Sequence, residues 1–153
     1  MDNSAQPSLA WSTPASLGAV MVVGGLLLGG AAAFSAPDPA GLVLMSIAAL
    51  LLVVLGVIAL VVRPRLAVID GHLIQIRTVT GARRYPFDAV RRAQVLTYSR
   101  YGRQVPHLEF DLDDTAAREG ERLVILGRWD LGTNPLDVAD ALRGVGLPVE
   151  TRK

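Results

Sequence analysis

The chain contains no cysteine, and this absence removes several kinds of chemistry at once. A disulfide framework, thiol catalysis and cysteine-based zinc or iron–sulfur sites are excluded. The two histidines, His72 and His107, accompany no nucleophile motif such as G-x-S-x-G. No glycine-rich phosphate loop opens a helix. The sequence therefore predicts a protein that is not an enzyme and that has no cofactor or metal.

Positive charge is missing from the first 62 residues, since all 15 Lys and Arg residues lie at or beyond Arg63. Asp2 and Asp38 are the only acidic side chains before that point. The chain thus divides into an apolar part followed by a polar part, and each part can be interpreted by itself.

Two uninterrupted apolar stretches, residues 16–36 and 40–62, fill most of the first part. A bilayer core about 30 Å thick needs roughly 20 helical residues, so each stretch is long enough to span it. The intervening Pro37-Asp38-Pro39 stops helix propagation and supplies a charge that belongs in water. We therefore expect a transmembrane hairpin over residues 16–62, preceded by an N-terminal tail over residues 1–15.

Basic residues near the spans predict the orientation. Arg63, Arg65 and Arg77 follow the second span, whereas the tail and the connection carry none. For this multi-pass cell-membrane protein, the positive-inside rule then predicts a cytoplasmic C-terminal domain. Trp11 lies near enough to the first span to be an interfacial anchor. A signal peptide is the competing interpretation of the first span because residues 31–33 are small, but the basic n-region is missing.

The first span contains a G-x-x-x-G motif formed by Gly25 and Gly29, with Ala33 one step further along the same face. Small residues at this spacing allow another helix to approach closely. Two partners stay open: the second span of the same chain, or a second copy of the protein.

The polar part shows six short segments with the alternation of strands: residues 66–70, 73–79, 83–87, 90–97, 107–112 and 122–126. Asp70-Gly71 is a hairpin-turn signal between the first two. A closing helix is indicated by Asn134 as its cap and Pro135 in its first turn, with Leu136, Ala139 and Leu142 on one face. The expected fold is α+β, mainly β: an antiparallel barrel or sandwich with a C-terminal helix.

Three segments resemble the bacterial pleckstrin-homology-like (PH-like) domains: RPRL at 63–66, YPFDAV at 85–90 and PLDVADAL at 135–142. The likeness is to the small two-span actinobacterial type, related to the low molecular weight protein antigen group. It implies a PH-like domain over residues 63–145, followed by a tail over residues 146–153, and a binding or assembly role. The first hairpin loop lacks the basic residues of phosphoinositide-binding relatives, so this ligand is not implied.

The candidate binding residues form a basic region in the membrane-proximal half of the polar part: Arg83, Arg84, Arg91, Arg92, Arg100, Tyr101 and Arg103. Anionic lipid is one candidate counter-charge, because basic residues near an anionic leaflet are attracted to it. A merely solvated surface is the other interpretation, and nucleic acid is disfavoured because the remaining domain is acidic. Asp111, Asp113 and Asp114 suggest a solvated acidic turn in preference to a cation site.

Two functions follow as hypotheses. The first is a non-enzymatic membrane-anchored interaction module, whose partners are membrane lipids and a protein or a second copy. The alternative is a structural subunit of a membrane complex, bound through its transmembrane helices.

Overall fold

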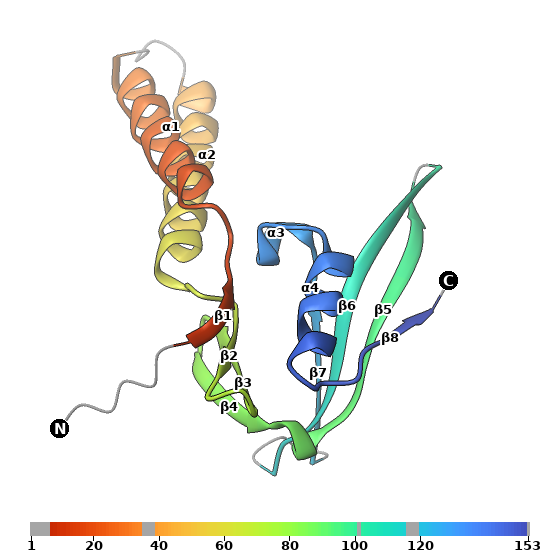
Figure 1. Ribbon diagram of the computed structural model, residues 1–153. Coiled ribbons are helices and arrows are strands. Elements are labelled where there is room, and N and C mark those ends of the chain that lie inside the picture. Colours follow the sequence, from red (N-terminus) through yellow and green to blue (C-terminus); the bar gives the residue numbers. More distant parts are fainter. Residues whose placement is uncertain (1–6, 35–38, 101, 116–119, 153) are drawn as a thin grey trace, which may run out of the picture. The chain divides into compact units, whose positions relative to one another are not determined.

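The computed structural model describes residues 7–34, 39–100, 102–115 and 120–152. The chain forms two compact units, one over Thr13–Arg63 and one over Met1–Ser12 together with Pro64–Lys153. We call them the helical hairpin and the soluble unit. The soluble unit is discontinuous in sequence, because the hairpin is inserted near its N-terminus (Figure 1).

The helical hairpin consists of α1 (Ala15–Phe34) and α2 (Pro39–Val61). Both helices lack charged residues and are long and apolar enough to cross a membrane. Their bounds differ from the predicted spans by one or two residues. The end of the first predicted span lies outside the described residues, as do Pro37 and Asp38.

Small residues at seven-residue intervals bring the two helices together. The buried positions are Gly18, Gly25 and Ala32 on α1, and Ala49 and Gly56 on α2. A Cβ atom on Gly25 would lie 2.7 Å from Val53 Cγ2, and one on Gly56 would lie 2.8 Å from the carbonyl oxygen of Gly18. The backbones therefore pack more closely than any side chain at these two glycines would allow.

The first sheet of the soluble unit has the order β1-β2-β3-β4, with all neighbours antiparallel. Its strands are β1 (Pro7–Trp11), β2 (Leu66–Ile69), β3 (Leu73–Thr78) and β4 (Gly81–Pro86). The predicted turn is present between β2 and β3, where Asp70 and Gly71 both have positive φ, 53° and 71°. Aspartate and glycine tolerate this left-handed region better than most residues.

The second sheet has the order β7-β6-β5-β8. Its strands are β5 (Val90–Arg100), β6 (Arg103–Asp113), β7 (Glu121–Leu126) and β8 (Glu150–Arg152), and a 3₁₀ turn, η1 (Phe87–Ala89), leads into β5. β8 pairs with β5 in parallel, and the other neighbours are antiparallel. All six predicted strands are present, so the mainly β fold is confirmed.

Two short helices follow β7: α3 (Arg128–Leu131) and α4 (Pro135–Gly144). α4 begins as expected, because the Asn134 side chain accepts a hydrogen bond from the Leu136 N–H at 3.2 Å. Its buried face differs from the predicted one. Val138, Ala139 and Leu142 are buried, whereas Leu136 is exposed.

The core lies between the inner faces of the two sheets and α4. Its largest fully buried side chains include Leu66 and Ile74 of the first sheet, Leu108 and Phe110 of the second, and Leu142 of α4. The burial of these apolar side chains holds the sheets and the helix together.

Both predicted tails contain strands of the soluble unit. β1 pairs with β2, with Trp11 opposite Leu66, and covers an edge of the first sheet. β8 covers the β5 edge of the second sheet. Open sheet edges present unpaired backbone groups, and this accounts for the pairing of two segments that lack a strong strand pattern.

Candidate functional site

The predicted basic residues of β4 point in two directions because they are neighbours on a strand. Arg83 Nη1 donates a hydrogen bond to Asp114 Oδ2 at 2.5 Å. Arg84 is exposed and donates from Nε to the Gln75 side-chain oxygen at 3.1 Å. The two residues therefore do not form one common binding surface.

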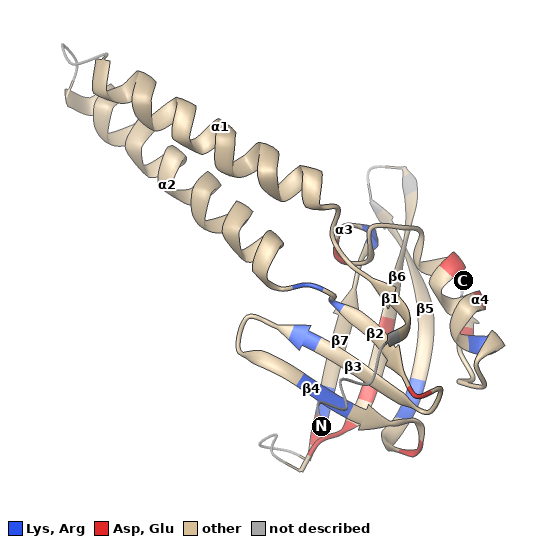
Figure 2. Ribbon diagram, turned by 60° about the vertical axis from the view of Figure 1, so that its left-hand side comes forward, with Lys and Arg blue, Asp and Glu red and all other residues tan. Residues whose placement is uncertain are grey.

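The predicted basic residues at the start of β5 are also separated by their contacts. Arg91 forms ion pairs with Asp113, at 2.6 Å from Nε, and with Glu121. Arg92 is exposed and lines a hollow of about 290 Å³ between β5 and the segment before β8. In Figure 2, positive and negative segments alternate in this part of the soluble unit.

The remaining predicted residues lie at the tip of the β5–β6 hairpin. Arg100 and Arg103 are Cα partners at the ends of the two strands. Tyr101 lies outside the described residues, as do the side chains of Arg100 and Arg103. Tyr98 nearby is half-exposed and packs edge-on against His107, with ring centroids 5.6 Å apart.

The predicted helix-packing residues of α1 do not share one buried face. Gly25 lies in the close contact with α2, and a Cβ on Gly29 would reach ordinary contact distance, 3.6 Å from Ala49 Cβ. Ala33 is exposed. Within the chain, the close packing follows the seven-residue spacing of Gly18 and Gly25 instead of the four-residue spacing of the motif.

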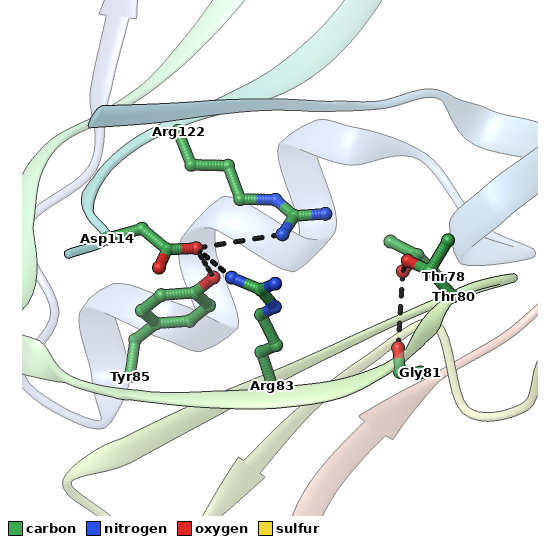
Figure 3. Close-up of polar contacts among 7 residues, drawn as sticks. All are labelled: Thr78, Thr80, Gly81, Arg83, Tyr85, Asp114 and Arg122. Carbon is green, nitrogen blue, oxygen red and sulfur yellow. Dashed lines mark hydrogen bonds and ion pairs between the residues drawn. The ribbon is translucent and has the colours of Figure 1, made fainter. Parts of the chain in front are cut away.

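A polar cluster joins the two sheets where their terminal strands β4 and β7 face each other (Figure 3). Its centre is Asp114, directly after β6, which is only 7% exposed. Asp114 Oδ2 accepts hydrogen bonds from Arg83, at 2.5 Å, and from the Tyr85 hydroxyl, at 2.8 Å. Arg122 Nη1 of β7 lies 3.6 Å from the same oxygen. We call these four residues the inter-sheet cluster.

The protonation of the cluster follows from its contacts. Burial raises the pKa of the Tyr85 hydroxyl, and its hydrogen bond to the Asp114 carboxylate raises it further. The same carboxylate raises the pKa of Arg83 through their hydrogen bond and charge attraction. Tyr85 is thus a neutral donor at physiological pH, and the cluster is a structural link between the sheets.

The three neighbouring aspartates differ in environment, contrary to the predicted solvated turn. Asp114 is buried in the inter-sheet cluster, whereas Asp113 is exposed and pairs with Arg91. Sequence reasoning missed the roles of Tyr85, Asp114 and Arg122, because three acidic residues within one short segment look alike before the fold buries one. Among the residues that the structure describes, no group of His, Asp or Glu side chains could hold a metal ion.

A second distinctive region is the end of the soluble unit where the chain leaves for the helices. Arg65 precedes β2, and its backbone N–H donates to the Trp11 carbonyl at 3.0 Å. Its side chain lies 3.7 Å from Asp130 of α3. Trp11 itself packs, partly buried, against the core. The predicted interfacial anchor thus belongs to the packing of β1.

Trp129, which precedes Asp130 in α3, is 74% exposed, and sequence reasoning did not predict this exposure. Arg128 beside it is exposed and lines a hollow of about 280 Å³. The other lining residues are Gln104, Val105, Pro106 and Asn134. An isolated tryptophan gives no pattern in sequence, so its exposure could be found only from the fold.

Comparison with known proteins places this architecture in a family. The Bacterial PH domain family matches residues 63–148, and the chain belongs to this family. PH domains are in general protein- or lipid-interaction modules, and no enzyme family is indicated.

Two curated relatives extend the similarity beyond that domain. They are Uncharacterized protein MT0013 of Mycobacterium tuberculosis (strain CDC 1551 / Oshkosh) and Uncharacterized protein Rv0010c of strain ATCC 25618 / H37Rv. Each is 34% identical over 138 residues, covering 90% of this chain and 92% of the relative. No solved structure matches the chain.

Proposed function

We propose that the protein is a non-enzymatic interaction module anchored in the bacterial cell membrane by the helical hairpin. Its PH-like unit docks a protein partner, orients on anionic lipid, or does both at the cytoplasmic face. We also propose that the protein is related to the low molecular weight protein antigen group. The observation that carries the proposed function is the insertion of two apolar helices between the adjacent strands β1 and β2.

This insertion ties the soluble unit to the hairpin through two short connections. Three residues separate Trp11 from Ala15, and four separate Val61 from Leu66. Because a residue spans at most about 3.6 Å, each connection reaches on the order of 15 Å. With the helices in a bilayer, both connections would hold the soluble unit near the lipid headgroups.

The expected orientation depends on the basic residues that follow α2. Arg63 and Arg65 come directly after it, and no Lys or Arg precedes them. The positive-inside rule therefore favours a cytoplasmic soluble unit. Since β1 belongs to that unit, this topology places the strands on both sides of the hairpin in one compartment, as their pairing requires.

The orientation is testable because the natural chain has no cysteine. Single cysteines are introduced as Asp38→Cys, between the helices, and as Asp137→Cys, on the exposed side of α4. A membrane-impermeant maleimide should label only Asp38→Cys in intact cells and both variants after permeabilisation. Labelling of Asp137→Cys alone in intact cells would reverse the orientation. Loss of the protein from the membrane fraction at alkaline pH would overturn anchoring itself.

The runner-up function is a structural subunit that binds its complex through the helices. It is favoured by a shallow apolar groove of about 410 Å³ on the hairpin, lined on α1 by Gly25, Gly29 and Gly30 among others. A Cβ on Gly30 would meet no atom within 4 Å, so its backbone is open to another helix.

Affinity purification in mild detergent separates the two functions. One variant, Arg84→Ser with Arg92→Ser, changes exposed arginines of the soluble unit and spares the paired Arg83 and Arg91. The other, Gly29→Leu, fills the groove, with Gly24→Leu outside it as the matched control. Partners lost only from the arginine variant support docking by the soluble unit. Partners lost only from Gly29→Leu support the structural subunit.

A further inference from the structure

We propose that α3 is a lipid-contacting element: Trp129 enters the interfacial layer of the bilayer, and Arg128 pairs with the phosphate of an anionic lipid. This inference rests on the proposed membrane anchoring and deepens it, because it names the surface of the soluble unit that meets the lipid. The partner is a bilayer surface and not a second protein.

The first support is the position of α3 in the soluble unit. The Arg65–Asp130 ion pair, at 3.7 Å, holds α3 beside the residue that links α2 to β2. Arg65 also contacts the end of β1 through the Trp11 carbonyl. α3 therefore lies at the end of the unit from which both connections to the helices depart.

The second support is that α3 is fixed while its tryptophan is turned outward. Leu131 is only 2% exposed and anchors the helix in the core. The Gly127 N–H donates to the Asp130 carboxylate at 3.1 Å, and Gly132 ends the helix with a φ of 72°. Because the backbone is capped at both ends, the exposure of Trp129 is a property of the fold.

Tryptophan on a folded surface favours an environment with one apolar and one wet side. The membrane interface offers this combination, and tryptophan is enriched there. Arg128 adds positive charge at the adjacent position, and the hollow that it lines leaves room for a headgroup. Attraction of the guanidinium to an anionic leaflet then acts at the same place as insertion of the indole ring.

A pair of exposed apolar residues on the second sheet fits a membrane poorly. Leu123 and Ile125 of β7 are exposed, but their Cα partners on β6 are Asp111 and Glu109. An anionic leaflet would repel these carboxylates. The contrast favours α3 over the outer face of the second sheet as the lipid-facing surface.

Tryptophan fluorescence of the full chain tests the inference, because Trp11 and Trp129 are its only tryptophans. A Trp11→Phe variant is reconstituted into vesicles of phosphatidylcholine and phosphatidylglycerol, in which some acyl chains carry bromine as a quencher. We expect the bromine to quench most of the Trp129 fluorescence, and we expect the emission maximum to shift to a shorter wavelength. Arg128→Gln should weaken the quenching to the level found with phosphatidylcholine alone.

Two controls make the measurement specific. In the triple variant Trp11→Phe, Trp129→Phe and Asp88→Trp, the single tryptophan lies in η1, just before β5. Arg128 of α3 instead lines a hollow with Gln104 and Val105, which pair with the opposite end of β5. The emission of the tryptophan at position 88 should persist. If Trp11→Phe fails to fold, comparing the natural chain with Trp129→Phe gives the quenching of Trp129 by difference.

The outcomes separate this inference from the proposed function. Vesicles that float with the protein but leave Trp129 unquenched would overturn the lipid contact of α3 and leave membrane anchoring in place. Equal quenching of the tryptophan at position 88 would also overturn the specific role of α3. Failure of the chain to float with the vesicles would overturn both.

Discussion

In the helical hairpin the closest contacts occur where side chains are missing, at Gly18, Gly25 and Gly56. In the soluble unit, charged and polar side chains of the terminal strands β4 and β7 meet at the buried carboxylate of Asp114. The two helices of the hairpin carry no charged side chains, so shape largely decides how they fit together. In the soluble unit, one buried carboxylate needs particular donors and thereby specifies how β4 meets β7.

The largest effect should follow from removing the acceptor of the inter-sheet cluster. Asp114→Ala removes the shared acceptor of Arg83, Tyr85 and Arg122, and the loss of its hydrogen bonds, each worth about 1.5 to 3 kcal/mol to a charged group, should cost about 3 kcal/mol. Denaturant unfolding of the full chain in detergent, followed by tryptophan fluorescence, measures this loss. Asp113→Ala is the matched control, because an exposed pair contributes about 1 kcal/mol or less. Equal losses would show that burial does not distinguish the two aspartates.

The next effect concerns the hairpin. Gly25→Leu places a Cβ 2.7 Å from Val53 Cγ2 and 2.9 Å from the Ala49 carbonyl oxygen, so the helices must separate. Overpacking of this kind costs about 2 kcal/mol. Thermal denaturation in detergent, followed by helical circular dichroism, should show a lower midpoint for this variant. Gly24→Leu, where no atom lies within 4 Å of the added Cβ, should leave the midpoint close to that of the natural chain.

A smaller effect should depend on pH through Tyr85. The folded-state pKa of its hydroxyl is raised above the unfolded value of about 10, so the neutral form is favoured by folding. The stabilisation is therefore complete below pH about 10 and is lost as the pH rises through the folded-state pKa. Tyr85→Phe should cost about 1 kcal/mol at neutral pH and should flatten the alkaline decline.

Unfolding free energies measured at increasing pH test this prediction. Tyr98→Phe is the control, because Tyr98 is half-exposed and lies outside the inter-sheet cluster. An alkaline decline that persists unchanged in Tyr85→Phe would assign the pH dependence to another group.

The smallest effect should come from Arg84→Ser. Arg84 is exposed and contacts only the Gln75 side chain among the polar contacts described for it, so the free energy of unfolding should change by about 0.5 kcal/mol or less. The same assay as for Asp114→Ala measures it. A loss as large as that of the aspartate variant would mean that the outer surface of β4 stabilises the unit more than its exposure implies.

The elements that could be predicted from sequence are those encoded by local pattern. Uninterrupted apolar runs identified both helices, alternation identified six strands, and the Asn134-Pro135 pair identified the start of α4. β1 and β8 could not be predicted, because their pairing depends on sheet edges contributed by distant segments. Both strands form because of tertiary contacts, which the local sequence pattern does not encode.

The candidate site was harder to predict than the fold, for a similar reason. The excess of arginine between Arg63 and Arg103 indicated a basic region, but folding pairs Arg83 and Arg91 with aspartates and a glutamate from the acidic part of the chain. Strand alternation alone separates the directions of Arg83 and Arg84. The burial of Asp114 and the exposure of Trp129 depend on how β4 and α3 pack, and linear sequence does not contain that signal.

The pairing of β1 with β2 across the hairpin also sets an order of events during synthesis. β1 leaves the ribosome first, but its partner strand follows only after both helices have been made. If the helices insert as they emerge, the first sheet can be completed only after insertion, when the two strands meet in the same compartment. Until β1 pairs, the β2 edge stays uncovered and prone to aggregate. Completion of the first sheet is therefore a late step in synthesis, which waits for both helices to be made.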